Sequence, residues 1–391
     1  MWTSLPAWLL EIVFGNLAPL EFFFRCRAVC AAWNKSLVAW STLSLQPAIS
    51  TPALVRQVLR INRNAGMRNL TLPQLFVKCT KELLQTWPRL RSLQLLSSSF
   101  DVALRHAPAT LEKLELYVCH VLHRDHVAVL STLRQLKVLR LNTIQYKMAF
   151  HDDITGRELG VCLSHLCNLE VLELHGASDL QDGTLEVLPA LHNLQRLELD
   201  SCTGLSDSAL SCLANCPKLE RLDLAHCRQL KFFSRLASSK SLRSLNLTST
   251  EIKNSELVPL LHSLQELNVS FCFEVSDAAF KRLEKLPTLR MLRLARPVNM
   301  AGRRLTNRTL EALSTWSALE SLDVQQCCNL TDDGLRHIQA LPSLQELKSW
   351  PCNLSASPLP TSLRRLTWLR APGAAFAPLV AVQELGRARG Q

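Results

Sequence analysis

The side chains best suited to chemistry in this sequence include a short run of histidines. His120, His123 and His126 recur at every third position. Imidazole nitrogens are common zinc ligands, so the spacing raises the question of a metal site. The surrounding leucine pattern, however, places His120 in a turn, His123 at the start of a helix and His126 in the first turn of that helix. We therefore expect three solvated imidazoles and no metal.

The 14 cysteines form the second group of reactive side chains. Cys212 and Cys216 lie one helical turn apart, as core residues do, and Cys162 and Cys167 lack the spacing of a zinc knuckle. The apolar stretch from Trp2 to Phe24 has neither a basic start nor a small-residue cleavage site, so we do not expect an export signal. We therefore expect reduced thiols and a cytoplasmic or nuclear protein.

The sequence contains no recognisable catalytic loop. Only 12 glycines occur, and there is no phosphate-cradling glycine-rich loop, nucleophile elbow or paired catalytic motif. The formal net charge is +11, but the basic residues are scattered rather than gathered in a dense run. No long uncharged apolar stretch predicts a membrane span. We expect no catalytic residue, no cofactor, no nucleic-acid partner and no membrane contact.

A repeat of about 25 residues organises most of the chain. Its copies carry leucine at relative positions 1, 4 and 6. The clear copies begin at Leu90, Leu111, Leu136, Leu169, Leu194, Leu219, Leu242, Leu264, Leu289, Leu319, Leu344 and Leu363. Weaker copies begin at Trp40 and Met67. Position 9 is often cysteine, and an apolar residue, a small polar residue and often Asp follow, as in Leu205-Ser206-Asp207.

Each conserved type in this pattern has a physical role. Leucines at positions 4 and 6 point to one face of a short strand, and the cysteine is a small buried hydrophobe beyond it. Ser206, Ser276 and Thr331 stand where a helix begins, so each can cap exposed N–H groups, and the following Asp suits the positive helix end. One repeat cannot bury its apolar faces, but a stack of repeats can.

This pattern resembles the cysteine-containing subclass of leucine-rich repeats. The resemblance covers residues from about 40 to 370. It implies an α/β solenoid in which parallel strands line the concave face and helices form the convex face.

A row of acidic side chains is expected on the strand face. Position 5 is Glu173, Glu198 and Asp223 in three consecutive repeats, and Asp200 adds position 7. Adjacent strands lie about 4.8 Å apart, so these like charges require compensation. Arginines at position 3, Arg196 and Arg221, can supply it as surface ion pairs. A basic segment of a protein substrate can also supply it, and we therefore predict these four acids as substrate-binding residues.

Two repeats are longer than the others, from Leu136 to Leu169 and from Leu289 to Leu319. The helix-start motif arrives late in both, so the extra residues fall between strand and helix on one rim. The predicted substrate-binding residues in these insertions are Tyr146, Phe150, Arg303 and Arg304. Insertions on one face often mark a binding face, although tolerated surface loops give the same pattern.

The first residues do not fit the repeat. They read Leu5-Pro6, then Leu9, Ile12 and Leu17 at helical spacing, and end Val29-Cys30-x-x-Trp33. This resembles the F-box, a small three-helix element. The resemblance implies that an adaptor subunit binds here and links the chain to a cullin. The residues expected to form or support that contact are Leu5, Pro6, Leu9, Ile12, Leu17, Val29 and Trp33.

The sequence thus predicts three parts: an F-box at residues 1–45, a repeat solenoid at residues 46–370 and a C-terminal tail at residues 371–391. An F-box followed by leucine-rich repeats implies the substrate-recognition subunit of an SCF-type (Skp-cullin-F-box) E3 ubiquitin ligase, without a catalytic site of its own. The alternative is a leucine-rich-repeat binding or inhibitor scaffold that acts outside a ligase. The tail either frays or folds back over the sheet.

Overall fold

A computed structural model represents the chain. It describes residues 42–44, 68–73, 84–85, 87–96, 101–117, 121–122, 124–142, 149–150, 156–177, 180–281, 283, 286–296, 305–339, 341–349, 365–367 and 383–384. The chain divides into two compact units, Met1–Glu173 (unit 1) and Leu174–Gln391 (unit 2). All seven predicted adaptor-contact residues lie outside the described residues, so the F-box stays a prediction.

Unit 1 contains a parallel sheet in the order β1-β2-β3-β4-β6. Its strands are β1 (Thr42–Ser44), β2 (Asn69–Pro73), β3 (Ser92–Leu96), β4 (Lys113–Tyr117) and β6 (Val138–Asn142). The next strand, β8 (Val171–Leu174), spans the boundary between the units. Helices α6 (Asp101–Arg105), α7 (Arg124–Leu130) and α8 (Gly156–Ser164) connect the later strands.

Unit 2 continues the same alternation of strand and helix. Its strands are β9 (Arg196–Glu198), β10 (Arg221–Asp223), β11 (Ser244–Asn246), β12 (Glu266–Asn268), β13 (Met291–Arg293), β14 (Ser321–Asp323), β15 (Glu346–Lys348), β16 (Arg365–Thr367) and β17 (Gln383–Glu384). Its helices are α9 (Asp182–Leu185), η4 (Leu188–Ala190), α10 (Asp207–Ala214), η5 (Phe233–Ser238), α11 (Asn254–Leu261), α12 (Asp277–Phe280), α13 (Asn307–Leu313) and α14 (Asp332–Ile338).

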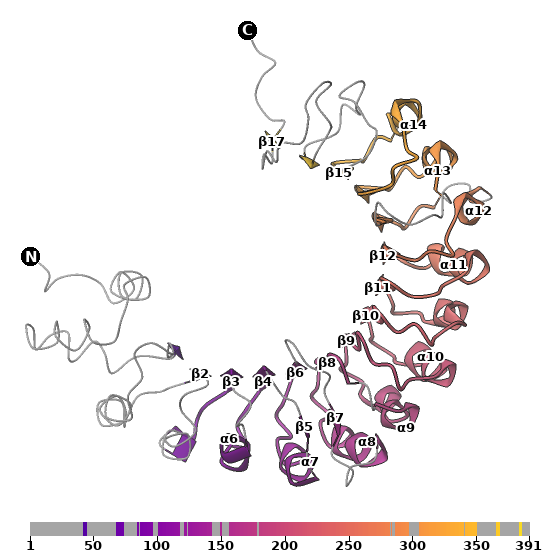
Figure 1. The fold of residues 1–391 in the computed structure, drawn as a ribbon. Coiled ribbons are helices and arrows are strands. Elements are labelled where there is room, and N and C mark those ends of the chain that lie inside the picture. Colours follow the sequence, from indigo (N-terminus) through magenta and orange to yellow (C-terminus); the bar gives the residue numbers. More distant parts are fainter. Residues whose placement is uncertain are drawn as a thin grey trace, which may run out of the picture. The chain divides into compact units, whose positions relative to one another are not determined.

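The strands of unit 2 pair in register along the repeat. Leu197, Leu222 and Leu245, each at position 4, lie opposite one another in β9, β10 and β11. Leucines at positions 1, 4 and 6 are almost completely buried. Figure 1 shows the helices of unit 2 on the outer side of its strands. These features are those of a leucine-rich-repeat solenoid, as the sequence predicted.

The residue at position 8 leaves the strand in the left-handed conformation. Ser201, His226, Ser249, Phe271 and Gln326 all have φ between 58° and 63°. Each of the first four donates its backbone N–H to the position 7 carbonyl of the next repeat, as Ser201 does to Ala225 at 2.8 Å. The left-handed region disfavours residues with a Cβ, so the inter-repeat hydrogen bond must offset this cost.

The first residue of each of the five helices α9 to α13 of unit 2 reaches toward the next repeat. A side-chain oxygen of this residue accepts a hydrogen bond from the backbone N–H at the helix start of the following repeat. We call these contacts the N1 ladder. Its members are Asp182 to Ser206 (2.8 Å), Asp207 to Lys231 (2.7 Å), Asn254 to Ser276 (3.0 Å), Asp277 to Thr306 (2.8 Å) and Asn307 to Thr331 (3.0 Å).

The N1 ladder changes the predicted roles of the cap residues. Ser206 caps α10 as predicted, because its hydroxyl accepts from the Ser208 N–H at 3.3 Å. Ser276 and Thr331 occupy the cap position, but their side chains make no cap hydrogen bond. Their hydroxyl oxygens instead accept from the amides of Asn254 and Asn307, each at 2.8 Å. The prediction of hydroxyl caps was therefore wrong at these two helices.

The predicted solvation of the histidine run was wrong for one member. His126 lies in the first turn of α7, as expected, but only 3% of it is exposed, beside buried Val127 and Leu130. The helix is short and its apolar stripe is narrow, so an aromatic ring in the first turn completes the buried face. His120 and His123 lie outside the described residues.

Both insertions fall between a strand and a helix, as predicted. The first follows β6 and includes β7 (Ala149–Phe150), which pairs in parallel with β5 (Val121–Leu122) of the preceding repeat. The second separates β13 from α13. Before it, buried Arg296 donates to the Cys272 carbonyl at 2.9 Å, which anchors the start of the insertion.

The C-terminal segment adds a strand to the edge of the sheet in unit 2. Strand β17 runs antiparallel to β16, with Glu384 opposite Arg365. This strand lies at the edge of the sheet and does not test whether the tail frays or folds back over the sheet, because the other residues of 371–391 lie outside the described residues. Among the helices that the structure describes, none has the length and apolarity that a membrane span requires.

Candidate functional site

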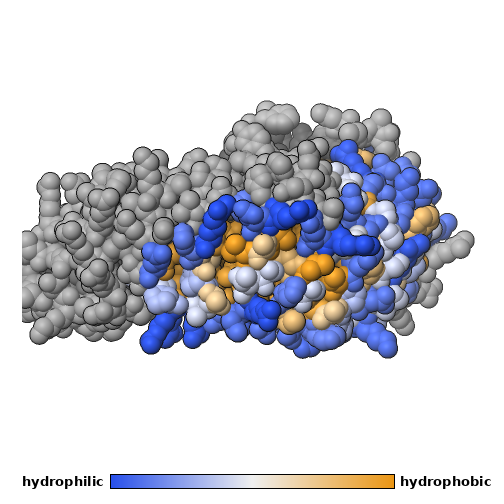
Figure 2. Space-filling model, turned by 90° about the horizontal axis from the view of Figure 1, so that it is seen from below, coloured by the Kyte–Doolittle hydropathy of each residue, from blue (hydrophilic) through white to orange (hydrophobic). Residues whose placement is uncertain are grey.

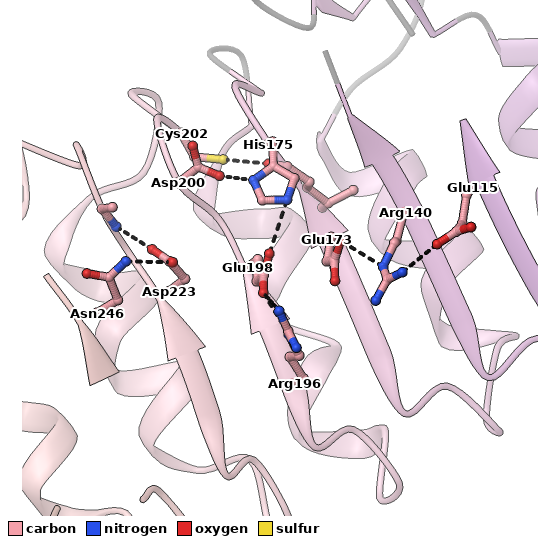
Figure 3. Close-up of polar contacts among 12 residues, drawn as sticks. Glu115, Arg140, Glu173, His175, Arg196, Glu198, Asp200, Cys202, Asp223 and Asn246 are labelled. Carbon is pink, nitrogen blue, oxygen red and sulfur yellow. Dashed lines mark hydrogen bonds and ion pairs between the residues drawn. The ribbon is translucent and has the colours of Figure 1, made fainter. Parts of the chain in front are cut away.

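The polar residues of the strand face are the candidate binding surface. In unit 1, Arg140 of β6 lies between two buried acids of neighbouring repeats (Figure 3). Its Nη1 pairs with Glu115 Oε1, and its Nε lies 2.8 Å from Glu173 Oε2. Burial opposes the charge of Arg140, but the hydrogen bonds and charges of both acids outweigh burial and raise the pKa of Arg140. The charge of Glu173 is therefore balanced within unit 1.

In unit 2, His175 holds two acids of β9 and the turn after it. Its Nε2 lies 3.1 Å from Glu198 Oε2, and its Nδ1 faces Asp200 Oδ1 (Figure 3). Glu198 also pairs with Arg196 on its own strand. The hydrogen bond from His175 is the largest influence on Glu198; together with Arg196 it outweighs burial and lowers the pKa of Glu198.

Asp223 lies beside Glu198 in the paired register of β9 and β10. Its two oxygens accept from the amide of Asn246 at 2.7 Å and from the backbone N–H of Ala225 at 2.8 Å. Neutral donors, not a cation, thus satisfy this carboxylate. The predicted ion pair with Arg221 is not among the contacts that the structure describes, whereas the predicted role of Arg196 is confirmed.

The same row continues with mixed charge at the end of unit 2. Arg293, Asp323 and Lys348 occupy position 5 in β13, β14 and β15 and lie opposite one another. Burial raises the pKa of Asp323, although a backbone N–H and both cations act in the other direction. The strand face therefore presents charges that are largely satisfied by neighbours on the sheet.

The structure gives unequal information on the predicted substrate-binding residues. It places Glu173 on the strand face of unit 1, and Glu198, Asp200 and Asp223 together on the strand face of unit 2. Tyr146, Arg303 and Arg304 lie outside the described residues, and of Phe150 only the backbone strand is described. Binding of substrate by any of them stays a prediction. Sequence reasoning missed His175, because its partner Asp200 lies 25 residues away in the next repeat.

The cysteines supply no activated thiol among the described residues. Cys202, Cys227, Cys272 and Cys327 are buried and free, and each Sγ lies within 3.4 Å of a position 6 carbonyl of the preceding repeat. Burial raises the pKa of Cys227 to about 12. A thiol of this kind is neither a nucleophile nor a metal ligand at neutral pH. The prediction that these cysteines act as small core residues is confirmed.

Large apolar side chains are exposed at few described positions. They are Val161 (53% exposed), Phe232 (52%) and Phe273 (39%). Val161 belongs to α8 of unit 1. Phe232 and Phe273 belong to unit 2. Figure 2 shows the face seen from below the view of Figure 1, where apolar residues gather between hydrophilic ones.

Comparisons with known proteins concern the fold. A scan of protein-family models and a search of curated proteins find no match. Many solved structures resemble the chain, and three of them illustrate the range. The first is the crystal structure of the Rad7 and Elc1 complex in yeast, to which the chain is 18% identical. The alignment covers 86% of this chain and 90% of the matched chain, with a TM-score of 0.46. The second is an internalin from Listeria monocytogenes, 18% identical. The alignment covers 74% of this chain and 89% of the internalin chain, with a TM-score of 0.36. The third is the TLR13–ssRNA13 complex, 17% identical. The alignment covers 76% of this chain and 55% of the matched chain, with a TM-score of 0.39.

Proposed function

We propose that this chain is the non-catalytic substrate-recognition subunit of an SCF-type E3 ubiquitin ligase. One observation carries the proposal: the pattern from Leu5-Pro6 to Val29-Cys30-x-x-Trp33 stands directly before a leucine-rich-repeat array. In this proposal the F-box binds the adaptor, and through it a cullin, while the repeats bind a protein substrate.

The strand face of the solenoid supports the second half of the proposal. Successive repeats place polar side chains at positions 3, 5 and 7 on one surface, and the buried leucines hold the backbone beneath them. A repeat array thereby offers an extended binding surface whose side chains vary without a change of core.

The proposed subunit acts by proximity. It holds a lysine of the substrate near the ubiquitin thioester that another subunit carries, and so raises the effective concentration of the two reactants. The bond-making chemistry belongs to the charged enzyme. Accordingly, the properties of this chain that matter are two affinities, one for the adaptor and one for the substrate.

The test is coprecipitation of the adaptor and cullin with the full chain and with variants. We expect Leu9→Asp to abolish adaptor binding, because a charge replaces an apolar contact, and Pro6→Ala to weaken it. Deletion of residues 1–40 should have the same effect as Leu9→Asp. Glu198→Lys, on the strand face of unit 2, is the matched control and should leave adaptor binding unchanged.

Adaptor binding that survives deletion of residues 1–40 would reject the ligase proposal. The alternative, a leucine-rich-repeat binding scaffold outside a ligase, would then account for the repeats. Loss of adaptor binding in Glu198→Lys as well as in Leu9→Asp would show that the contact does not reside in the F-box.

A further inference from the structure

One repeat of unit 2 departs from the pattern at the start of its helix. The cap residue and the following Asp, for example Ser206-Asp207 and Ser276-Asp277, are replaced by Lys231-Phe232 in the repeat that begins at Leu219. The short 3₁₀ helix η5 stands there in place of an α-helix. A polar, anionic pair has thus become a cationic and apolar pair at the same position of the fold.

The exposed side chain of Phe232 is not needed to fill the core. Its neighbour Phe233 is completely buried and supplies the aromatic ring that packs inside the repeat, whereas 52% of Phe232 is exposed. The guanidinium of Arg235 lies over the Phe232 ring, 5.7 Å from its centroid. An exposed aromatic ring beside a cation is a composition that is enriched at protein interfaces.

The backbone beneath this ring is fixed before any partner binds. Asp207 Oδ1 accepts from the N–H groups of both Lys231 and Phe232, at 2.7 and 3.0 Å. Nη1 of Arg235 donates to the Asp207 carbonyl at 3.2 Å and to Ser211 Oγ at 3.0 Å. A surface that is already ordered loses less conformational entropy on binding.

Basic residues stand beside Phe232 in the sequence and at the matching position of the next repeat; of the acids in this region Asp207 and Glu256 are engaged, whereas Glu251 is exposed. Arg228, Lys231 and Lys253 are exposed, and among the described residues none of them has an ion-pair partner. Lys253 occupies the helix-start position of the next repeat, as Lys231 does in its own. Asp207 accepts hydrogen bonds from the backbone N–H groups of Lys231 and Phe232. Glu256 accepts from the N–H and hydroxyl of Ser234 at 3.0 and 2.6 Å.

We propose that Arg228, Lys231, Phe232, Arg235 and Lys253, here called the Phe232 surface, bind an acidic protein segment that carries an apolar side chain. The cations attract the acidic residues, and the apolar side chain packs on the Phe232 ring. Identification of that segment as part of the ligase substrate rests on the proposed function. The binding chemistry does not, because it depends on this surface alone.

The test uses a fluorescent synthetic peptide of Asp and Glu with one central Leu, and the full chain, in an anisotropy titration at low and high salt. We expect Phe232→Ser and Lys231→Glu each to weaken binding at least about fivefold, since each removes an apolar or an ionic contact. Binding should fall as salt rises. The same peptide with Ser in place of Leu should bind the wild-type chain more weakly.

Phe273→Ser is the matched control. Phe273 is also exposed on unit 2, but Glu274 follows it, so its loss should leave peptide affinity unchanged. Thermal unfolding of each variant should match that of the wild type, because the changed side chains are exposed. Vesicles that contain anionic lipid serve as a second probe.

No measurable affinity for the acidic peptide, or an equal loss in Phe273→Ser and Phe232→Ser, would overturn the proposal. Tighter binding to the vesicles than to the peptide would also overturn it in favour of a membrane surface. The Leu9→Asp variant separates the two proposals: it should lose the adaptor and keep the peptide. If the wild-type chain fails to bind adaptor but binds the peptide, only the ligase assignment falls.

Discussion

At the scale of single residues, the contact between His175 and two carboxylates has a protonation requirement. A neutral imidazole has one N–H, so it can donate to Glu198 or to Asp200 but not to both. The imidazolium form has two N–H groups and donates to both. Other charges nearby are engaged elsewhere: Arg196 with Glu198, and Glu173, two residues earlier, with Arg140.

This arrangement predicts a stability that falls in acid. The hydrogen bonds from His175 and Arg196 hold the pKa of Glu198 below its usual range, so the contribution of this carboxylate is present above about pH 4.3, the value of an unfolded glutamate, and is lost as the pH falls. We expect His175→Gln to lower the free energy of unfolding by about 1 kcal/mol at pH 7 and by less at pH 3. Urea unfolding at both pH values measures the difference, with exposed His192→Gln as the control. An equal loss at both pH values would show that His175 acts independently of the Glu198 charge.

At the scale of elements, the N1 ladder explains why one helix needs a glycine. A Cβ on Gly334 of α14 would lie 2.4 Å from Asn307 Oδ1 and 2.8 Å from Leu310 Cδ1. Asn307 is the ladder residue that holds Thr331. Gly183 of α9, by contrast, has no atom within 4 Å of its Cβ position. The two glycines therefore form a matched pair.

We expect opposite results when alanine replaces these two glycines. Gly183→Ala should raise the free energy of unfolding by about 0.5–1 kcal/mol, because alanine favours the helix and restricts the unfolded chain. Gly334→Ala should lower it by about 1–3 kcal/mol, since the methyl group displaces Asn307 and its bonds to Thr331. Denaturant unfolding measures both values. A gain in stability for Gly334→Ala would mean that Asn307 moves without loss.

The leucine spacing predicted strands and buried positions, because burial of a repeated apolar pattern allows few solutions. The left-handed residues at position 8 were not predicted, because Ser249, Phe271 and His226 are not the glycines that φ above zero favours. The contact between His175 and Asp200 was also missed. It joins residues 25 apart, and side-chain geometry across repeats is not written in a single repeat.

At the scale of the whole molecule, the reactivity of each cysteine thiol reports whether the repeat around it is folded. Burial raises the pKa of Cys162, Cys216 and Cys227 to about 12, and Cys167 is exposed. At pH 8 a thiol with a pKa near 12 is ionised in roughly one molecule in ten thousand, and only the thiolate reacts rapidly.

We therefore expect iodoacetamide at pH 8 to label Cys167 in the native chain and to leave these three buried cysteines unlabelled. Peptide mass spectrometry after quenching identifies the labelled positions, and labelling in denaturant is the control. Slow labelling of a buried cysteine would report local opening of its repeat. Labelling of Cys227 at the same rate as Cys167 in the native chain would contradict the burial of the Cys227 thiol.

The N1 ladder also decides where repeats can be exchanged between proteins of this fold. Its acceptor belongs to one repeat and its donor to the next, so a transplanted repeat needs a compatible neighbour on each side. The repeat that begins at Leu219 donates to Asp207 through the N–H groups of Lys231 and Phe232, but the Phe232 side chain has no oxygen that could accept from the repeat that follows. There the roles are reversed: the N–H and hydroxyl of Ser234 donate to Glu256 of the following repeat. A chimaera joined at Leu242 must therefore import a repeat with an acid at the third residue of its helix, in its first turn, where Glu256 stands in α11.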